Sequence, residues 1–398
     1  MQSNKFFTYE NKLLIVLFFT FGLIFMDKMS FTFLLPFIQK DLGFSNTQSG
    51  LVLGILSAFF GISTLVFSIY SDIIGSKKKM LVIFVILFSL ATLSVGLISD
   101  FNSMLIVRAL MGITEGPAVP LILSTVLAAS TVSRRGFNMG LIKGAGPLMS
   151  GVFAPMILIP IALSSNWKWG FYTLAIPGFI MATVIWFFMK EPVFESEEKP
   201  NWNELKGVIK NRNVQLCLLI SIFFMTNLIS FIGFAPLYWA NMKQVPQSEI
   251  SVFLAVFGIG CFVWFFVIPM LSDKFGRKPT LTFFALASMA LPLVMANFNL
   301  SFGMTILVLL TLTCAMGYMP LFDAVIPAES VPHKYAATVM ALTVLTGEVI
   351  GGTLGPIISG MMADKYDLHA PFYVGATAAF IAFLLSLGIK ETAPKVRI

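Results

Sequence analysis

Long apolar runs separated by short polar loops make up almost the whole chain. Twelve of these runs each approach the ~20 residues that an α-helix needs to cross the hydrocarbon core of a bilayer. We predict membrane-spanning helices near residues 13–37, 48–70, 80–98, 102–127, 137–163, 169–189, 214–239, 249–271, 279–298, 302–327, 335–361 and 371–389. The pattern therefore predicts an all-α integral membrane protein with twelve transmembrane helices.

The loops between these runs alternate in charge. Loops on the side of the N-terminus hold nearly all of the loop lysines and arginines. The opposite loops hold only Lys40, Lys168, Lys243 and Lys365. Basic loops stay on the cytoplasmic side of a membrane, and twelve crossings return the chain to the side where it began. We therefore predict a multi-pass protein of the cytoplasmic (plasma) membrane with both termini in the cytoplasm.

One long polar connection divides the chain into two halves of six spans. We predict an N-terminal bundle at 1–189, a cytoplasmic linker at 190–213 and a C-terminal bundle at 214–398. The halves share a loop sequence, which is SDIIGSKKK after the second span and SDKFGRKP after the eighth. A duplicated six-span unit is typical of transporters built from repeats, so we expect the bundles to be related by a pseudo-two-fold axis.

The repeated loop has the pattern Asp–x–x–Gly followed by basic residues. Its residues are Asp72 and Gly75 in the first copy and Asp273, Gly276 and Arg277 in the second. The glycine allows a tight turn, and the aspartate can cap the next helix or pair with an arginine of a neighbouring loop. The pattern predicts two tight cytoplasmic turns at equivalent places in the two halves.

Composition supports a membrane protein and argues against several other classes. Hydrophobic residues make up 57% of the chain and charged residues 11%. The three cysteines lie inside apolar runs and the two histidines lie in loops, so we predict no disulfide framework, metal site or cofactor. The net charge of +7 is explained by the basic cytoplasmic loops rather than by binding to nucleic acid. The bilayer is the expected surrounding, and a monomer suffices.

The stretch from Arg108 to Pro120, RALMGITEGPAVP, places two ionisable residues inside an apolar run. Arg108, Gly112 and Glu115 share one helix face, with the two charged residues roughly 10 Å apart along the axis. Ionisable side chains at this depth are costly and usually face a cavity or a partner. A structural ion pair between two helices is one interpretation. We prefer an anion and proton site in a membrane cavity.

Four sequence segments resemble known families. The two loops resemble the G-x-x-x-D-R-x-G-R-[KR] motif of the major facilitator superfamily, although Ser68 and Ile73 depart from it in the first copy and Pro269 in the second. The first span and its exit, MDKMSFTFLLPFIQKDLGFSNTQSG, look like the corresponding segment of the anion:cation symporters, the sialin and sugar-acid type, with Lys28 in place of an arginine. The stretch RALMGITEGPAVP is similar to that family's R-x-x-x-G-x-x-E-x-x-x-x-P.

This resemblance implies a fold of two six-helix bundles and assigns roles to particular residues. In such symporters the residues that match Asp27 and Glu115 couple proton movement, and those that match Lys28 and Arg108 bind the anion. The family's fold also implies that spans 1, 4, 7 and 10 line a central cavity and that the two repeated loops act in gating. From the residues alone, an arginine suits a carboxylate because it keeps its charge and donates a bidentate pair of hydrogen bonds.

Further polar residues lie inside apolar runs of the second half. Asn227 and Glu348 are predicted substrate ligands, although Asn227 can instead bond a neighbouring helix and Glu348 can be a protonated packing group. Glu348 has no basic partner within its own half. Asp323 is interpreted as a gate or cap, and Lys143 either extends to the cytoplasm or lines the cavity.

The sequence predicts a secondary transporter that imports a small organic anion, such as a sugar acid or aromatic acid, by proton symport. The proton gradient is the expected energy source. The segment from Gly144 to Gly151 partly resembles an element of drug/proton antiporters, so a proton-driven exporter of drugs or metabolites is the alternative. A substrate sensor that does not transport is a third possibility. An enzyme is not expected, because no nucleophile–base or metal constellation is present.

Overall fold

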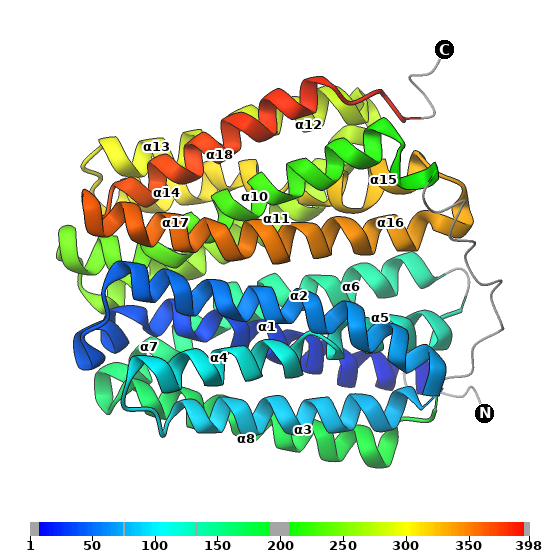
Figure 1. The fold of residues 1–398 in the computed structure, drawn as a ribbon, viewed down its shortest axis with the longest axis horizontal. Coiled ribbons are helices and arrows are strands. Elements are labelled where there is room, and N and C mark those ends of the chain that lie inside the picture. The colour runs from blue at the N-terminus through cyan, green and yellow to red at the C-terminus, as the bar shows by residue number, and fades with distance from the viewer. Residues whose placement is uncertain (1–7, 75, 132–133, 192–206, 394–398) are drawn as a thin grey trace, which may run out of the picture.

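The computed structural model describes residues 8–74, 76–131, 134–191 and 207–393, and these residues form helices without any strand. Within these residues, six of the twelve predicted spans are single helices, and the other six are made of consecutive pieces (Figure 1). In chain order the elements are α1 (Tyr9–Leu42), α2 (Asn46–Ile74), α3 (Lys77–Val95), α4 (Phe101–Glu115), α5 (Ala118–Ala129), α6 (Arg135–Leu148), η3 (Met149–Phe153), α7 (Ala154–Ser164), α8 (Trp167–Phe188), α10 (Arg212–Leu237), η4 (Tyr238–Met242), α11 (Gln247–Phe275), α12 (Arg277–Ala287), α13 (Ala290–Asn297), α14 (Phe302–Leu312), η5 (Thr313–Met316), η6 (Leu321–Val325), α15 (Ile326–Glu329), α16 (His333–Thr346), η7 (Gly347–Gly351), α17 (Gly352–Lys365) and α18 (Ala370–Leu387).

The twelve predicted spans correspond to these helices. In the described part of the chain, eleven helical segments are long and apolar enough to cross a membrane. The tenth predicted span, 302–327, begins with the shorter apolar helix α14 and continues through η5, η6 and α15. The predicted all-α membrane fold is confirmed, and its tenth crossing consists of short consecutive helices.

Proline explains one of the breaks within a predicted span. The span predicted at 102–127 is two helices, because α4 ends at Glu115 and α5 begins at Ala118. Pro117 lies between them, and a proline lacks the backbone N–H that would continue the helical hydrogen bonds. Glu115 is therefore the last residue of α4, at a break in the helix.

The elements fall into two groups in space. In Figure 1, α1–α8 occupy the lower half of the view and α10–α18 the upper half. Helix α1 begins and α18 ends at the same end of the molecule, on the right of the view. This arrangement fits an even number of crossings. The two-bundle division at 1–189 and 214–398 stays a prediction, and most of the linker predicted at 190–213 lies outside the described residues.

Small residues let the two groups approach each other closely at two places. A Cβ atom added at Gly54 on α2 would lie 2.7 Å from the Thr353 carbonyl oxygen on α17, and one added at Gly50 would collide with the Pro356 carbonyl. In the second place, Gly151 in η3 lies directly against Gly258 on α11. Small residues at regular spacing are the usual means by which membrane helices pack backbone to backbone.

A side chain of one group also caps a helix of the other. The Asp364 carboxylate on α17 accepts hydrogen bonds from the backbone N–H groups of Asn46 (2.9 Å) and Thr47 (2.8 Å), the first residues of α2. An anionic group at a helix N-terminus bonds free N–H groups and opposes the positive end of the helix dipole. The two groups are thus held together at the end opposite the termini.

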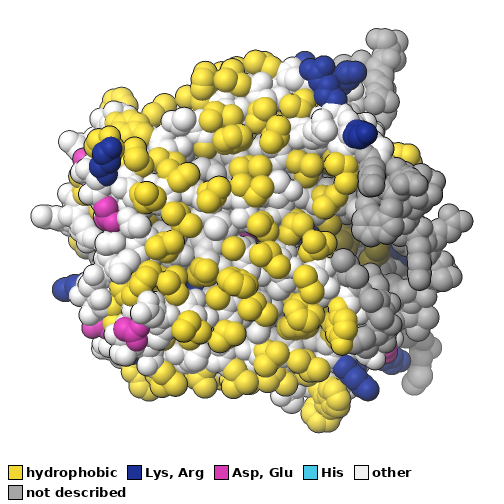
Figure 2. All heavy atoms as spheres, in the orientation of Figure 1, with side chains coloured by type: hydrophobic (Ala, Val, Ile, Leu, Met, Phe, Trp, Pro, Cys, Tyr) yellow, Lys and Arg dark blue, Asp and Glu magenta, His cyan; other side chains and the backbone are white. Residues whose placement is uncertain are grey.

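The outer surface of the molecule is apolar as well as its interior. Large hydrophobic side chains such as Leu97, Phe187 and Met270 are 75%, 82% and 70% exposed. Figure 2 shows hydrophobic side chains covering the broad face between the two ends, with charged side chains near the ends. Helices that are apolar on both their inner and outer faces belong in a lipid bilayer.

Candidate functional site

The predicted site residues of α4 are fully buried against neighbouring helices. Arg108 is 1% exposed and Glu115 is not exposed at all. Gly112, between them, lies against the backbone of α2, because an added Cβ would come within 2.5 Å of the Leu56 carbonyl oxygen. The glycine therefore makes room for α2, and its neighbours Arg108 and Glu115 project into the helix assembly.

The Arg108 guanidinium has few polar partners. Its Nη2 donates a long hydrogen bond, 3.4 Å, to the backbone carbonyl of Lys28, and its Nη1 lies 3.8 Å from the Met111 sulfur. Its Cζ lies 5.0 Å from the centroid of the Phe31 ring. Its Nε has no partner, and no acidic side chain in the described part of the chain lies within ion-pair distance of it. A buried guanidinium has five donors, so most of this donor capacity is unused.

Asp27 on α1 and Glu115 lie close enough to interact directly. Their carboxyl groups act on each other, and Arg108 acts on both through its charge. The Thr92 hydroxyl on α3 donates to Asp27 Oδ2. Asp27 Oδ1 and both oxygens of Glu115 have no donor among the described residues. Sequence reasoning did not single out Thr92, since a threonine within an apolar span carries no distinguishing signal.

The structure gives Glu348 a partner from the other half of the chain. The Lys28 ammonium on α1 donates to Glu348 Oε1 in η7 at 2.7 Å, and the two residues are 4% and 9% exposed. The ammonium also lies 4.2 Å from the centroid of the Phe60 ring on α2. Glu348 Oε2 has no hydrogen-bond partner in the part of the chain that the structure describes. The two predicted substrate ligands Lys28 and Glu348 are thus brought together as an ion pair.

Asp323 and Lys143 lie near this pair. Asp323 in η6 is 7% exposed and interacts electrostatically with both Lys143 on α6 and Glu348. Lys143 is half-buried. We define the charged cluster as Asp27, Lys28, Arg108, Glu115 and Glu348. Asp323 and Lys143 lie beside this cluster, and Asp323 belongs to the tenth span.

Asn227 is not part of this cluster. Its side-chain amide donates to the Ser288 carbonyl at 3.5 Å, and a Cβ atom added at Gly375 on α18 would lie 2.8 Å from its Oδ1. These contacts place Asn227 among the helices of its own half. The structure therefore favours the interpretation of Asn227 as a contact between helices, which was the alternative to substrate binding.

The second repeated loop forms a dense network of hydrogen bonds and ion pairs. Arg277 Nη1 donates to Asp273 Oδ1 at 2.5 Å and to Ser272 Oγ at 2.7 Å, and its Nη2 donates to Glu329 Oε1 at 3.0 Å. Gly276 adopts φ +100°, which agrees with the predicted need for glycine in the turn. Its gating role stays a prediction.

Asp273 has neither of the two roles expected for it, which were capping the next helix and pairing with an arginine of a neighbouring loop. Asp273 pairs with Arg277 of its own loop and does not cap α12. The Glu391 carboxylate accepts from the backbone N–H groups of Arg277 (2.8 Å) and Lys278 (3.1 Å) instead. In the first copy, the Asp72 side chain and Gly75 lie outside the described residues.

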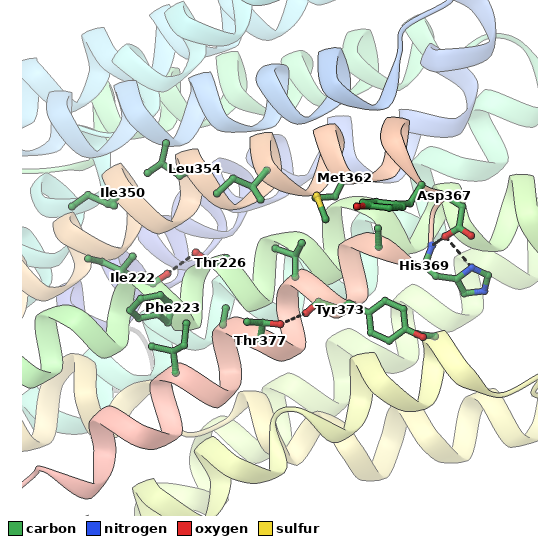
Figure 3. A pocket seen from close by; sticks show the side chains of 17 residues that line it. Ile222, Phe223, Thr226, Ile350, Leu354, Met362, Asp367, His369, Tyr373 and Thr377 are labelled. Carbon is green, nitrogen blue, oxygen red and sulfur yellow. Dashed lines mark hydrogen bonds and ion pairs between the residues drawn. The ribbon is translucent and has the colours of Figure 1, made fainter.

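An open apolar groove lies away from the charged cluster. It has a volume of about 950 Å³ and is lined by side chains of α10, α17 and α18, among them Phe223, Leu354 and Thr377 (Figure 3). At one end, His369 and Asp367 form a hydrogen-bonded pair. None of the predicted site residues lines this groove, so it does not support the sequence-based site.

The family model of the Major Facilitator Superfamily matches residues 17–349 of the chain. The hexuronate transporter of Bacillus subtilis (strain 168) is 28% identical over 282 residues, which are 68% of this chain and 66% of that protein, so the chain spans just under two thirds of its length. The multidrug resistance protein MdtG of Proteus mirabilis (strain HI4320) is 31% identical over 158 residues, 39% of each chain. A mutant of the nucleoside transporter NupG has the same fold, with a TM-score of 0.81 at 16% identity, over 96% of this chain and 100% of that one.

Proposed function

Because the chain belongs to the Major Facilitator Superfamily, we propose that it is a secondary transporter that imports a small organic anion together with protons by alternating access. Its family and its structural neighbours are transporters, so the chain is a transporter and not an enzyme. In this proposal the groups α1–α8 and α10–α18 are the two bundles that move. The proton gradient supplies the energy without a cofactor, and both termini lie in the cytoplasm.

The observation that carries the proposal is the incomplete coordination of Arg108. A buried arginine without an acidic side chain within ion-pair distance is costly, because the more distant charges of Asp27 and Glu115 only partly replace the water that the guanidinium has lost. An external carboxylate can accept two parallel hydrogen bonds from the guanidinium and form the close ion pair that these acids do not form. The name of the hexuronate transporter among the relatives supports a sugar acid as the carboxylate.

The pairing of Asp27 with Glu115 supports proton coupling. Three of their four carboxyl oxygens have no protein donor, and buried polar atoms are almost always hydrogen-bonded. A single proton placed between the two carboxyl groups provides a donor for one of these oxygens and removes one negative charge. When an anion binds Arg108, it competes with Asp27 and Glu115 for that positive charge, which favours protonation of the acids. Anion and proton would therefore move together.

The match to a multidrug resistance protein favours the alternative, a proton-driven exporter of drugs or metabolites. The segment from Gly144 to Gly151 was the sequence feature behind that alternative. In the structure Gly151 packs against Gly258, which accounts for a glycine there through helix contact alone. Arg108 in the charged cluster has no acidic side chain within ion-pair distance in the described part of the chain, which suits an anion better than a cationic drug.

The proposal is tested by reconstituting the protein into liposomes that contain a pH-sensitive dye. Glucuronate, galacturonate, aromatic acids and dicarboxylates are added one at a time, and the pH of the lumen is followed. Proton symport predicts acidification by one class of acid. We expect the signal to be lost in Asp27→Asn and in Glu115→Gln.

Asp100→Asn is the matched control, because Asp100 is an exposed acidic residue directly before α4, lies outside the cluster and the repeated loops, and is replaced by another good helix cap. It should keep the acidification. Alkalinisation by cationic drugs, with no response to any acid, would establish the exporter instead. Binding of an acid without any flux would show a sensor.

A further inference from the structure

The Lys28–Glu348 ion pair joins the two groups of helices deep inside the molecule. Lys28 belongs to α1, and Glu348 belongs to η7, a π-helical turn between α16 and α17. Such turns occur mostly as local insertions in helices and frequently at functional sites. The pair lies next to the contact of α2 with α17, since a Cβ added at Gly352 would meet both Ser57 and the Glu348 carboxylate. Separating the two groups of helices would therefore also separate these two charges.

A charge left alone at this depth is strongly disfavoured. Besides Glu348, the Lys28 ammonium has the Phe60 ring centroid at 4.2 Å and the Phe25 ring centroid at 6.0 Å, and its charge also acts on the Glu115 carboxyl. Aromatic faces attract an ammonium, but far less strongly than a carboxylate does in a dry environment. Breaking a buried pair by removing one partner leaves an uncompensated charge. Without Glu348, Lys28 has no acidic side chain within ion-pair distance in the described part of the chain, so another anion at this place would stabilise its charge.

Glu348 can leave the pair more easily than Lys28 can. It is the more exposed of the two, its Oε2 has no donor in the structure, and Asp323 nearby acts on it as a second negative charge. The backbone carbonyl of Lys28 also accepts a hydrogen bond from the Arg108 guanidinium, most of whose other donors are unused. An incoming carboxylate would meet two cations there, one of which is already neutralised by Glu348.

We propose that Glu348 is an internal counter-ion of Lys28 that the carboxylate of the transported anion replaces, so that anion binding itself breaks this link between the two groups of helices. The inference rests on the proposed function for the identity of the anion. It adds a physical reason why an empty protein stays closed at this contact: without an anion, separating the helices isolates the Lys28 charge.

The exchange is tested with acetate as a minimal carboxylate, in the absence of any transport assay. Glu348→Ala removes the internal carboxylate and leaves space for an external one. We expect acetate to raise the melting temperature of the purified Glu348→Ala protein by at least about 3 °C, because it binds the folded state at Lys28. Chloride at the same concentration corrects for ionic strength.

The matched control is the double variant Lys28→Met/Glu348→Ala, which has the same space without the cation. Stabilisation by acetate in the single variant and not in the double variant supports the exchange. Equal stabilisation in both, or in neither, overturns it. If the single variant is recovered poorly, Glu348→Gln keeps the packing and is measured in the same way, with a larger acetate response than the wild-type protein expected.

The outcome is independent of the transport assay. Should acetate act through Lys28 while no organic acid crosses the membrane in liposomes, the counter-ion exchange stands and the proposed substrate class fails. Should an acid be transported without any acetate response in the variants, the proposed function stands and the role of Glu348 fails. When both hold, Glu348→Gln should show a lower Kd for the transported acid than the wild-type protein and a lower rate of net transport.

Discussion

Arg108 and Arg277 are both arginines that lie among acidic side chains, but their donors are used very differently. Arg277 bonds Ser272, Asp273 and Glu329 with all three of its side-chain nitrogens. Arg108 makes one long bond to a carbonyl and one contact with a sulfur, and its Nε has no partner. The loop network around Arg277 is complete within the protein, and the charged cluster around Arg108 is not.

The acidic residues of the two regions differ in the same way. Glu391 accepts hydrogen bonds from four backbone N–H groups, those of Arg277, Lys278, Thr392 and Ala393. Glu115 accepts none from the described protein groups. Buried polar atoms that the protein itself leaves unbonded are costly, so they persist where a ligand or a proton completes them. The comparison therefore separates a region that supports the fold from a region that is available for chemistry.

The largest expected effect is on Arg108. Arg108→Ala should reduce uptake of the transported acid into proteoliposomes by roughly 100-fold or more, because a buried charge-assisted contact to the substrate is lost. Arg108→Lys keeps the charge but loses the bidentate geometry, so it should recover only part of the activity. An Arg108→Ala protein that still concentrates its substrate would remove the basis of the proposed function.

Next in size is the effect of Glu115→Gln on energy coupling. This variant should exchange substrate across the membrane but no longer accumulate it against a gradient, since the proton-carrying group is gone. Its melting temperature should stay the same or rise, because the amide supplies a donor to Asp27 where two carboxyl groups faced each other. The measurements are counterflow, uptake driven by an imposed pH gradient, and thermal unfolding. A marked loss of stability would instead show that Glu115 has a structural role.

Arg277→Ala should have the reverse profile. Removing the arginine leaves Glu329 and Asp273 without their cation and should lower the free energy of unfolding by about 2 kcal/mol. Substrate affinity should change by less than about threefold, because this change in binding free energy is smaller than the loss of one substrate contact. Thermal unfolding and equilibrium binding on the same preparation check this. If affinity fell while stability was kept, the loop would belong to the binding site.

The smallest effect concerns the pH dependence of Glu391, which lies beyond the end of α18. Burial raises its pKa, but the backbone N–H groups of Ala393, Arg277 and Lys278 more than offset this, and the net pKa lies below its ordinary value of 4.5. A carboxyl whose pKa is lower in the folded state stabilises the fold above its unfolded pKa, and this contribution is lost as the pH falls through the folded value. Melting temperatures should therefore decline below about pH 4.5 more steeply in the wild-type protein than in Glu391→Gln. Parallel profiles would contradict the capping role.

The sequence alone determined where the chain crosses the membrane. The apolar runs predicted the spans to within a few residues, including the two at 214–239 and 371–389 that appear as α10 and α18. This succeeds because a helix in lipid must satisfy all of its backbone groups within its own segment, so local composition is decisive. Arg108 and Glu115 lie on one helix, and Gly276 adopts the turn that needs glycine. Both features depend on residues close together in the sequence, so they could be predicted from it.

Only the tertiary structure decided which polar groups meet. The partner of Lys28 is Glu348, 320 positions further along the chain, and the cap of α12 is Glu391 rather than Asp273. Asn227 is a polar residue inside an apolar span, as are the residues of the charged cluster, yet it packs against Ser288 and Gly375. Pairings of this kind depend on how helices rotate and approach one another, which is set by small contact residues such as Gly54 and Gly151 on both sides of an interface. The sequence of one helix does not indicate which face of a neighbouring helix will pack against it, so these contacts can be identified only in the folded structure.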